Sequence, residues 1–156
     1  MEILYLLDDL KRLPPVNTSA VRWLEVGDFA LLAEHLRLCG QKPLSREKWE
    51  AICAAGGRYC GCFEGDKMVA RACVEPLNER VWETADVRTA AAWRGRGCAT
   101  AACAFATRDT LGQGRVATIR TEADNLRMRQ VIARLGFREL GPADRIDLSS
   151  ICERQI

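Results

Sequence analysis

Apolar and polar positions change period several times along the chain, and each change predicts a new element. From Ile3 to Leu13 apolar residues recur at helical spacing until Pro14-Pro15 ends the run, which predicts a short amphipathic helix. The apolar positions from Ala20 to Val26 predict a first strand. Two helices should follow, Phe29 to Cys39 and Ser45 to Ala55, the second with Ser45 as its N-cap.

The middle of the chain has the pattern of strands. A hairpin is expected from Arg58 to Glu64 and Met68 to Glu75, followed by a third strand from Val81 to Thr89. The remaining expected elements are a helix Gly97 to Leu111, a strand Val116 to Glu122, a helix Asn125 to Leu135, a strand beginning at Phe137, and a last strand between Asp144 and Cys152. This order predicts an α+β fold with one mixed, largely antiparallel central sheet flanked by helices.

Length and charge narrow the class of protein. A chain of 156 residues fits one domain, residues 1–156, in which residues 1–18 form an extra N-terminal segment. Its 23 basic and 21 acidic residues are spread along the chain, which gives no field suited to nucleic acid. We therefore expect no nucleic-acid partner.

The start of the chain lacks the features of a signal peptide, because its apolar run is short and turns acidic at Asp8-Asp9. No stretch approaches the ~20 apolar residues of a membrane span, so we expect a cytoplasmic protein without a membrane partner. In that compartment the eight cysteines should be reduced, mostly in the core. Cys60-Gly61-Cys62 has no second ligand pair, so no metal is expected. The single histidine, His35, is interpreted as a solvated or capping residue.

The segment Trp93-Arg94-Gly95-Arg96-Gly97-Cys98-Ala99-Thr100 lies between an expected strand and an expected helix. Glycines there let backbone N–H groups face outward, and a helix N-terminus adds partial positive charge, so the turn suits a phosphate or diphosphate. Arg94 and Arg96 add full charges. A plain strand-to-helix turn with solvated arginines is the alternative.

Two other phosphate motifs fit less well. A P-loop needs a Gly-Lys dipeptide, which the chain lacks. A dinucleotide fingerprint is matched at Gly95 and Gly97, but Thr100 replaces its third glycine, and the fingerprint belongs on the first strand of a parallel sheet.

The motif from Arg94 to Ala99 resembles the diphosphate loop [QR]-x-x-G-x-[GA] of the GCN5-related N-acetyltransferase (GNAT) family, with Trp93 as the preceding aromatic residue. Glu122-Ala123-Asp124-Asn125 followed by Leu135-Gly136-Phe137 resembles the second signature of that family. The clear resemblance covers residues 59–140, and the order of elements extends it to Ala20.

The resemblance implies an acetyl-CoA-dependent N-acetyltransferase, with acetyl-CoA as cosubstrate. Its pantetheine arm would lie along the end of the third central strand, where unpaired N–H and C=O groups can bind an amide and polarise the thioester carbonyl. The cofactor-binding residues implied are Val87, Arg88, Thr89, Arg94, Gly95, Arg96, Gly97, Cys98, Ala99, Thr100 and Asn125.

An ammonium must lose a proton before its nitrogen can attack, so the reaction needs a base. Glu83 is the first candidate, since it lies eleven residues before Arg94, as the catalytic glutamate does in histone-acetylating members. Asp86 is the second candidate and should point to the opposite face of the strand. The alternative for both is a cross-strand charge pair with Arg88 or Arg71.

The chain also departs from the family. Ile132 stands where many members carry a tyrosine that protonates the leaving thiolate, and Tyr5, Tyr59 or water are the substitutes considered. The proline common before the loop is absent. These departures keep a second function open, a non-catalytic acyl-CoA-binding sensor or regulatory module. The acceptor, a small-molecule or peptide amine, is not identified, and the apolar N-terminal segment leaves a homodimer open.

Overall fold

Strands β3, β4 and β5 form where the sequence predicts a hairpin and a third strand. A computed structural model describes residues 1–153. The bounds of these three strands are β3 (Arg58–Glu64), β4 (Lys67–Pro76) and β5 (Val81–Thr89). The hydrogen-bonded strand order is β2-β3-β4-β5-β6-β1-β7, a mostly antiparallel seven-stranded sheet in which β5 and β6 pair in parallel. The expected α+β class with a mixed sheet is confirmed.

The chain divides into two compact units. The first comprises Met1–Pro15, Glu75–Ala85 and the part from Thr107 onward, and the second comprises Val16–Val74 and Asp86–Ala106. Strands β4 and β5 and helix α3 (Cys98–Gly112) each contribute residues to both units. The boundary within β5 falls between Ala85 and Asp86, so the two candidate bases belong to different units.

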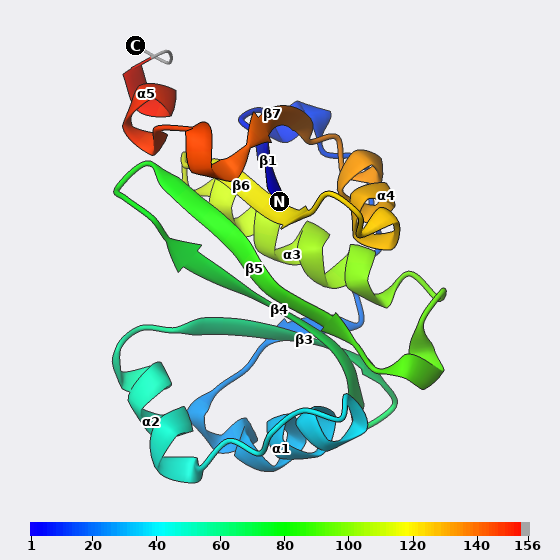
Figure 1. The fold of residues 1–156 in the computed structure, drawn as a ribbon. Coiled ribbons are helices and arrows are strands. Elements are labelled where there is room, and N and C mark those ends of the chain that lie inside the picture. Colours follow the sequence, from blue (N-terminus) through cyan, green and yellow to red (C-terminus); the bar gives the residue numbers. More distant parts are fainter. Residues whose placement is uncertain (154–156) are drawn as a thin grey trace. The chain divides into compact units, whose positions relative to one another are not determined.

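The second unit holds the two early helices. Its further elements are β2 (Val21–Trp23), the 3-10 turns η2 (Val26–Asp28) and η3 (Ala91–Trp93), α1 (Phe29–Leu38) and α2 (Arg46–Ala54). Ser45 caps α2 as expected, with its hydroxyl oxygen 3.2 Å from the Lys48 amide. Helices α1 and α2 lie on one face of β3 and β4 (Figure 1), where Leu32, Trp49 and Met68 form a core cluster.

The first unit is built on a strand from the N-terminus. Its elements are β1 (Glu2–Leu7), the turn η1 (Leu10–Arg12), β6 (Val116–Glu122), α4 (Leu126–Arg134), β7 (Arg138–Pro142), the turn η4 (Ala143–Arg145) and α5 (Leu148–Glu153). Strand β1 is antiparallel to both β6 and β7. One core cluster of this unit consists of Leu6, Val81, Val116 and Ile151.

Two expected elements are wrong. The N-terminal segment is a strand rather than an amphipathic helix, because all residues from Ile3 to Leu7 are buried in β1 between two strands. A strand that is buried on both faces has a continuous apolar run. Periodicity alone does not distinguish such a run from a buried helix. The tail from Asp144 to Cys152 is not a strand, since η4 and α5 occupy it.

Smaller differences concern β2 and the cysteines. Strand β2 is shorter than expected, because Val26 already starts the turn η2. Seven cysteines are free thiols, of which Cys60, Cys62, Cys73 and Cys103 are buried. The side chain of Cys152 lies outside the described part. None of the described helices combines the length and the apolar character needed to cross a bilayer.

Candidate functional site

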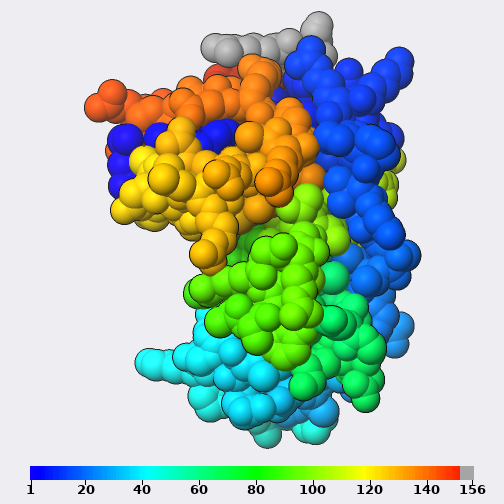
Figure 2. Space-filling model, turned by 90° about the vertical axis from the view of Figure 1, so that its right-hand side faces the viewer, coloured from blue at the N-terminus to red at the C-terminus, as the bar shows by residue number. Residues whose placement is uncertain are grey.

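The turn before α3 has an open, glycine-dependent backbone. Gly95 and Gly97 have φ angles of +79° and +80°, a region that side-chain-bearing residues rarely adopt. A Cβ atom at either glycine would meet nothing within 4 Å, so conformation and not crowding requires glycine here. The green segment around residues 91–100 is exposed in the space-filling view (Figure 2). The backbone of the turn is therefore open to solvent.

Helix α3 opens at this turn, as expected. The Ala101 amide donates to the Gly97 carbonyl at 2.9 Å, which makes Gly97 the residue that precedes the helix. The amides of Cys98, Ala99 and Thr100 therefore have no acceptor within the helix, and they lie at its partially positive end. Arg94 is exposed, and Arg96 forms an exposed ion pair with Glu64 at 3.1 Å. Main-chain donors, nearby cations and open space together fit an anionic group.

The other predicted cofactor residues are divided between the chain's two units. Val87, Arg88 and Thr89 end β5 in the second unit, and the Thr89 hydroxyl is buried without a hydrogen-bond partner among the described residues. Asn125 belongs to the first unit, where its side-chain oxygen accepts from the Met128 amide at 3.1 Å and caps α4. Its observed role is thus to begin a helix.

Glu83 is a buried carboxylate in the first unit. Its side chain is 7% exposed, and Arg120 Nε donates to its Oε1 at 2.8 Å. Burial raises the pKa of Glu83 above its usual value, and the Arg120 guanidinium opposes that rise. A carboxyl group in this setting has the properties of a general base, since its affinity for a proton is increased.

Asp86 belongs to the second unit and is held by two neighbours. Arg71 donates to both of its oxygens, at 3.2 and 3.0 Å, and the Tyr59 hydroxyl donates at 3.1 Å. The cross-strand charge pair considered for Asp86 is thus present, with Arg71 as partner. Asp86 also has a φ angle of +50°, which few residues other than glycine adopt and which aspartate tolerates better than most. Such conformations concentrate at functional positions.

His35 lies behind Arg71, and its interpretation as a solvated or capping residue is wrong. Its side chain is fully buried, with Nδ1 3.2 Å from the Met68 carbonyl and Nε2 3.2 Å from Arg71 Nη1. A carbonyl only accepts and a guanidinium only donates, so Nδ1 carries the proton and Nε2 accepts from Arg71. Burial, aided by the Arg71 charge, lowers the pKa of His35 to about 4, so the ring is neutral at pH 7.

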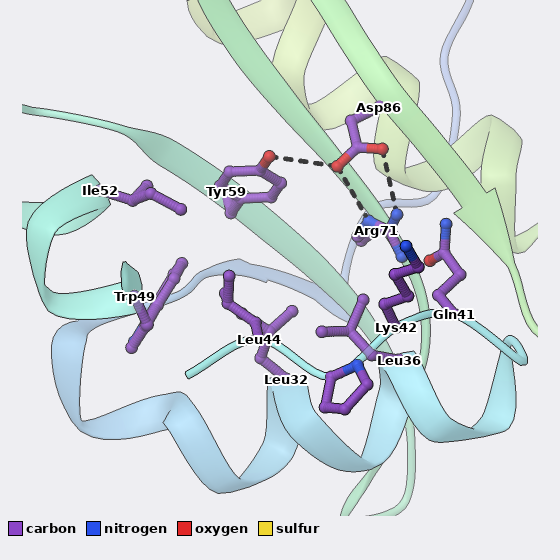
Figure 3. A pocket seen from close by; sticks show the side chains of 11 residues that line it. Leu32, Leu36, Gln41, Lys42, Leu44, Trp49, Ile52, Tyr59, Arg71 and Asp86 are labelled. Carbon is purple, nitrogen blue, oxygen red and sulfur yellow. Dashed lines mark hydrogen bonds and ion pairs between the residues drawn. The ribbon is translucent and has the colours of Figure 1, made fainter. Parts of the chain in front are cut away.

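Asp86, Arg71 and Tyr59 line a pocket of about 490 Å³ in the second unit. Figure 3 shows Arg71 beside Lys42 and Gln41 at one end of the pocket, and Trp49 and Ile52 at the other. The apolar lining residues are Leu32, Leu36, Pro43, Leu44, Trp49 and Ile52. They come from α1, from α2 and from the loop between these helices, a region whose sequence has no recognisable motif.

The structure shows the surroundings of Ile132 and of the two tyrosines considered as substitutes for the missing acid. Ile132 is fully buried in α4, so the usual acid is replaced by a core residue. The hydroxyl of Tyr5 accepts from Arg129 Nε at 3.0 Å in the first unit, and that of Tyr59 is bound to Asp86. Burial raises the pKa of Tyr59 far above its usual value. Neither tyrosine is free of partners.

The Gly-Phe motif has a structural reason. Gly136 follows α4 with a φ angle of +86°, and a Cβ there would lie 2.6 Å from the Arg12 carbonyl oxygen. Only glycine allows this approach. The signature therefore fixes the path of the chain after α4.

Sequence reasoning missed the role of His35 and the individual residues that line the pocket. A signal for the cluster existed, since Arg71 interrupts the buried apolar run of β4 and a buried charge needs partners. No signal in the sequence indicates that His35 is the second partner. Within the described residues, no group of three or more His, Cys, Asp or Glu side chains could hold a metal ion.

Two similar solved structures are bacterial acetyltransferases. An acetyltransferase from the GNAT family of Colwellia psychrerythraea matches with a TM-score of 0.73 and 15% identity over 90% of this chain and 53% of its own. A GCN5-related N-acetyltransferase from Sphaerobacter thermophilus matches with a TM-score of 0.66 and 16% identity over 90% of this chain and 48% of its own. The chain thus spans about half the length of these two proteins.

A shorter relative matches more evenly. The ribosomal-protein-S18-alanine N-acetyltransferase of Escherichia coli aligns over 76% of both chains with a TM-score of 0.62 and 14% identity. At such identities the likeness shows the fold alone. A search of curated protein sequences finds no significant match.

Family membership rests on the sequence itself. The profile of the acetyltransferase (GNAT) family matches residues 19–137, which is most of the chain and includes the turn before α3 and the Gly-Phe motif. The fold agrees with this match. The chain belongs to the acetyltransferase (GNAT) family.

Proposed function

We propose that this protein is an acetyl-CoA-dependent N-acetyltransferase that acetylates an amine by direct attack in a ternary complex. The observation that carries the proposal is the turn before α3, with its glycine backbone, its helix amides that have no acceptor within the helix, and its open surface. The amides of Cys98, Ala99 and Thr100 would hold the diphosphate of acetyl-CoA, with Arg94 and Arg96 as counter-charges. The end of β5, Val87 to Thr89, would take its amide-bearing arm.

Acetyl-CoA supplies an acetyl group activated as a thioester. Glu83 takes a proton from the acceptor ammonium, and the amine nitrogen then bonds to the acetyl carbon while the C–S bond breaks. The sulfur leaves as a thiolate, which is feasible without a dedicated acid because a thiol has a pKa of roughly 8.5. The second proton that the nitrogen loses as the amide forms passes to this thiolate, so CoA is released as its thiol. The raised pKa of Glu83 supports this assignment, and the donors that hold both oxygens of Asp86 make that residue the weaker candidate.

Calorimetry with acetyl-CoA tests the cofactor site. Gly97→Glu and Arg94→Glu place a carboxylate against the diphosphate and should abolish binding. Gly114→Glu is the matched control for the glycine, since Gly114 has a φ of +78° and equally open surroundings. Arg12→Glu makes the same charge change as Arg94→Glu at an exposed turn of the first unit. Binding that is unchanged in the first two variants would refute the assignment of the turn.

Turnover separates the enzyme from a sensor. Acetyl-CoA consumption with a panel of amines should be lost in Glu83→Gln while acetyl-CoA binding is kept. If the wild-type protein binds acetyl-CoA and acetylates no amine in a broad panel, the enzymatic proposal fails and a regulatory module takes its place.

A further inference from the structure

The pocket in the second unit has two chemically different ends. Leu44, Trp49 and Ile52 give one end an apolar wall, whereas Asp86, Arg71 and Lys42 lie at the other (Figure 3). A volume of about 490 Å³ is in the range of sites for small organic molecules. The pocket therefore suits a compact ligand with one polar and one apolar part.

The charges at the polar end disfavour a polycation. Two cationic side chains, Lys42 and Arg71, face one carboxylate, Asp86. Arg71 already compensates Asp86 through two hydrogen bonds, so the lining as a whole is positive. A ligand with several ammonium groups would meet like charge there and find no excess of carboxylates.

Asp86 is nevertheless a well-placed acceptor for one N–H group. Its side chain is 43% exposed, while Arg71 is 4% exposed and fixed from behind by His35 Nε2. A carboxylate accepts more hydrogen bonds than the three that Arg71 and Tyr59 donate. One amine can therefore be oriented by Asp86 without displacing Arg71.

We infer that this pocket binds the acceptor, and that the acceptor is a primary amine with one apolar substituent and no second cationic group. The inference rests on the proposed function and narrows its acceptor class. The apolar substituent packs against Leu44 and Trp49, and the nitrogen lies beside Asp86. Polyamines and aminoglycosides should bind more weakly, because they carry several ammonium groups.

Calorimetry with the full chain, in the presence and absence of CoA, tests the inference with 2-phenylethylamine, hexylamine and spermidine as probes. The two apolar amines should bind at least about tenfold more tightly than spermidine, since repulsion and lost apolar contact act together. Leu44→Asp places a charge on the apolar wall and should weaken binding of the apolar amines at least about tenfold. Leu10→Asp, the same change at an exposed turn, should leave it unchanged.

A gain of binding provides a second test that folding defects do not mimic. Lys42→Glu gives the lining two carboxylates and one cation, and should shift the preference toward spermidine. Tighter binding of spermidine to the wild type, or apolar-amine binding that Leu44→Asp leaves intact, would overturn the inference. Acetyl-CoA binding is measured separately: if it is present and the apolar amines fail to bind, the acceptor class is wrong while the proposed function stands.

Discussion

Glu83 and Asp86 lie three residues apart on one strand, yet their surroundings differ. The Glu83 side chain is 7% exposed and has Arg120 as its charged partner, at 2.8 Å. The Asp86 side chain is 43% exposed and accepts hydrogen bonds from Arg71 and Tyr59. One carboxylate is thus buried with modest compensation, and the other is open to solvent but firmly held.

This difference teaches that burial and hydrogen bonding separate two acids that look alike in sequence. Burial favours the protonated form and increases proton affinity, which a base needs. Donors that fix a carboxylate stabilise its charged form and its position, which a binding group needs. Glu83 therefore suits proton transfer, and Asp86 suits orientation of a ligand.

The largest expected effect comes from the base. Glu83→Gln keeps the shape and removes the proton acceptor, so kcat should fall by about 10²–10⁴-fold. Asp86→Asn should act mainly on KM for the amine. Steady-state kinetics with acetyl-CoA saturating would measure both. An equal loss of kcat in the two variants would remove the distinction between the acids.

Removing each arginine tests the same contrast through stability. Arg120→Met leaves Glu83 buried without its counter-charge and should cost about 3–5 kcal/mol. In Arg71→Met, water can solvate the partly exposed Asp86, but buried His35 loses its hydrogen-bond donor. The free energy of unfolding should therefore fall by about 1–3 kcal/mol. Urea unfolding at pH 7 measures both. The reverse order would mean that the His35 contact, and not burial of the acid, dominates.

These residues also show where sequence reasoning reached and where it stopped. Strands β3 to β6 and the turn before α3 were predictable, because strand-forming runs, glycines and the motif are local features. Strand β1 was not, because its burial comes from pairing with β6 and β7, far along the chain. The contact of His35 with Arg71 joins a helix to a strand 36 positions away, and no local pattern encodes it.

His35 should make the free energy of unfolding depend on pH. Its pKa is near 6.5 when unfolded and about 4 when folded, so between these values the unfolded chain binds more protons. The neutral His35 therefore contributes to the free energy of unfolding above pH 6.5. This contribution, up to about 3 kcal/mol, is lost as the pH falls toward 4.

Glu83 acts in the opposite sense. Its pKa is raised on folding, so its contribution diminishes as the pH rises above the usual glutamate value. Urea unfolding at pH 7 and pH 5 for the wild type and His35→Gln separates the two groups. The variant should lose less stability on acidification, and parallel losses in both proteins would exclude His35 as the source.

The smallest effect should come from an exposed arginine–carboxylate pair, Arg96 with Glu64. Both side chains are more than half exposed, so Glu64→Gln should change the free energy of unfolding by less than about 0.5 kcal/mol. The same substitution removes the carboxylate that competes for Arg96 beside the proposed diphosphate site. Acetyl-CoA affinity should therefore rise slightly at low salt and lose this gain at high salt, where exposed charges are screened. Calorimetry at two salt concentrations measures the difference, and an affinity gain that persists at high salt would point to a change in the turn itself.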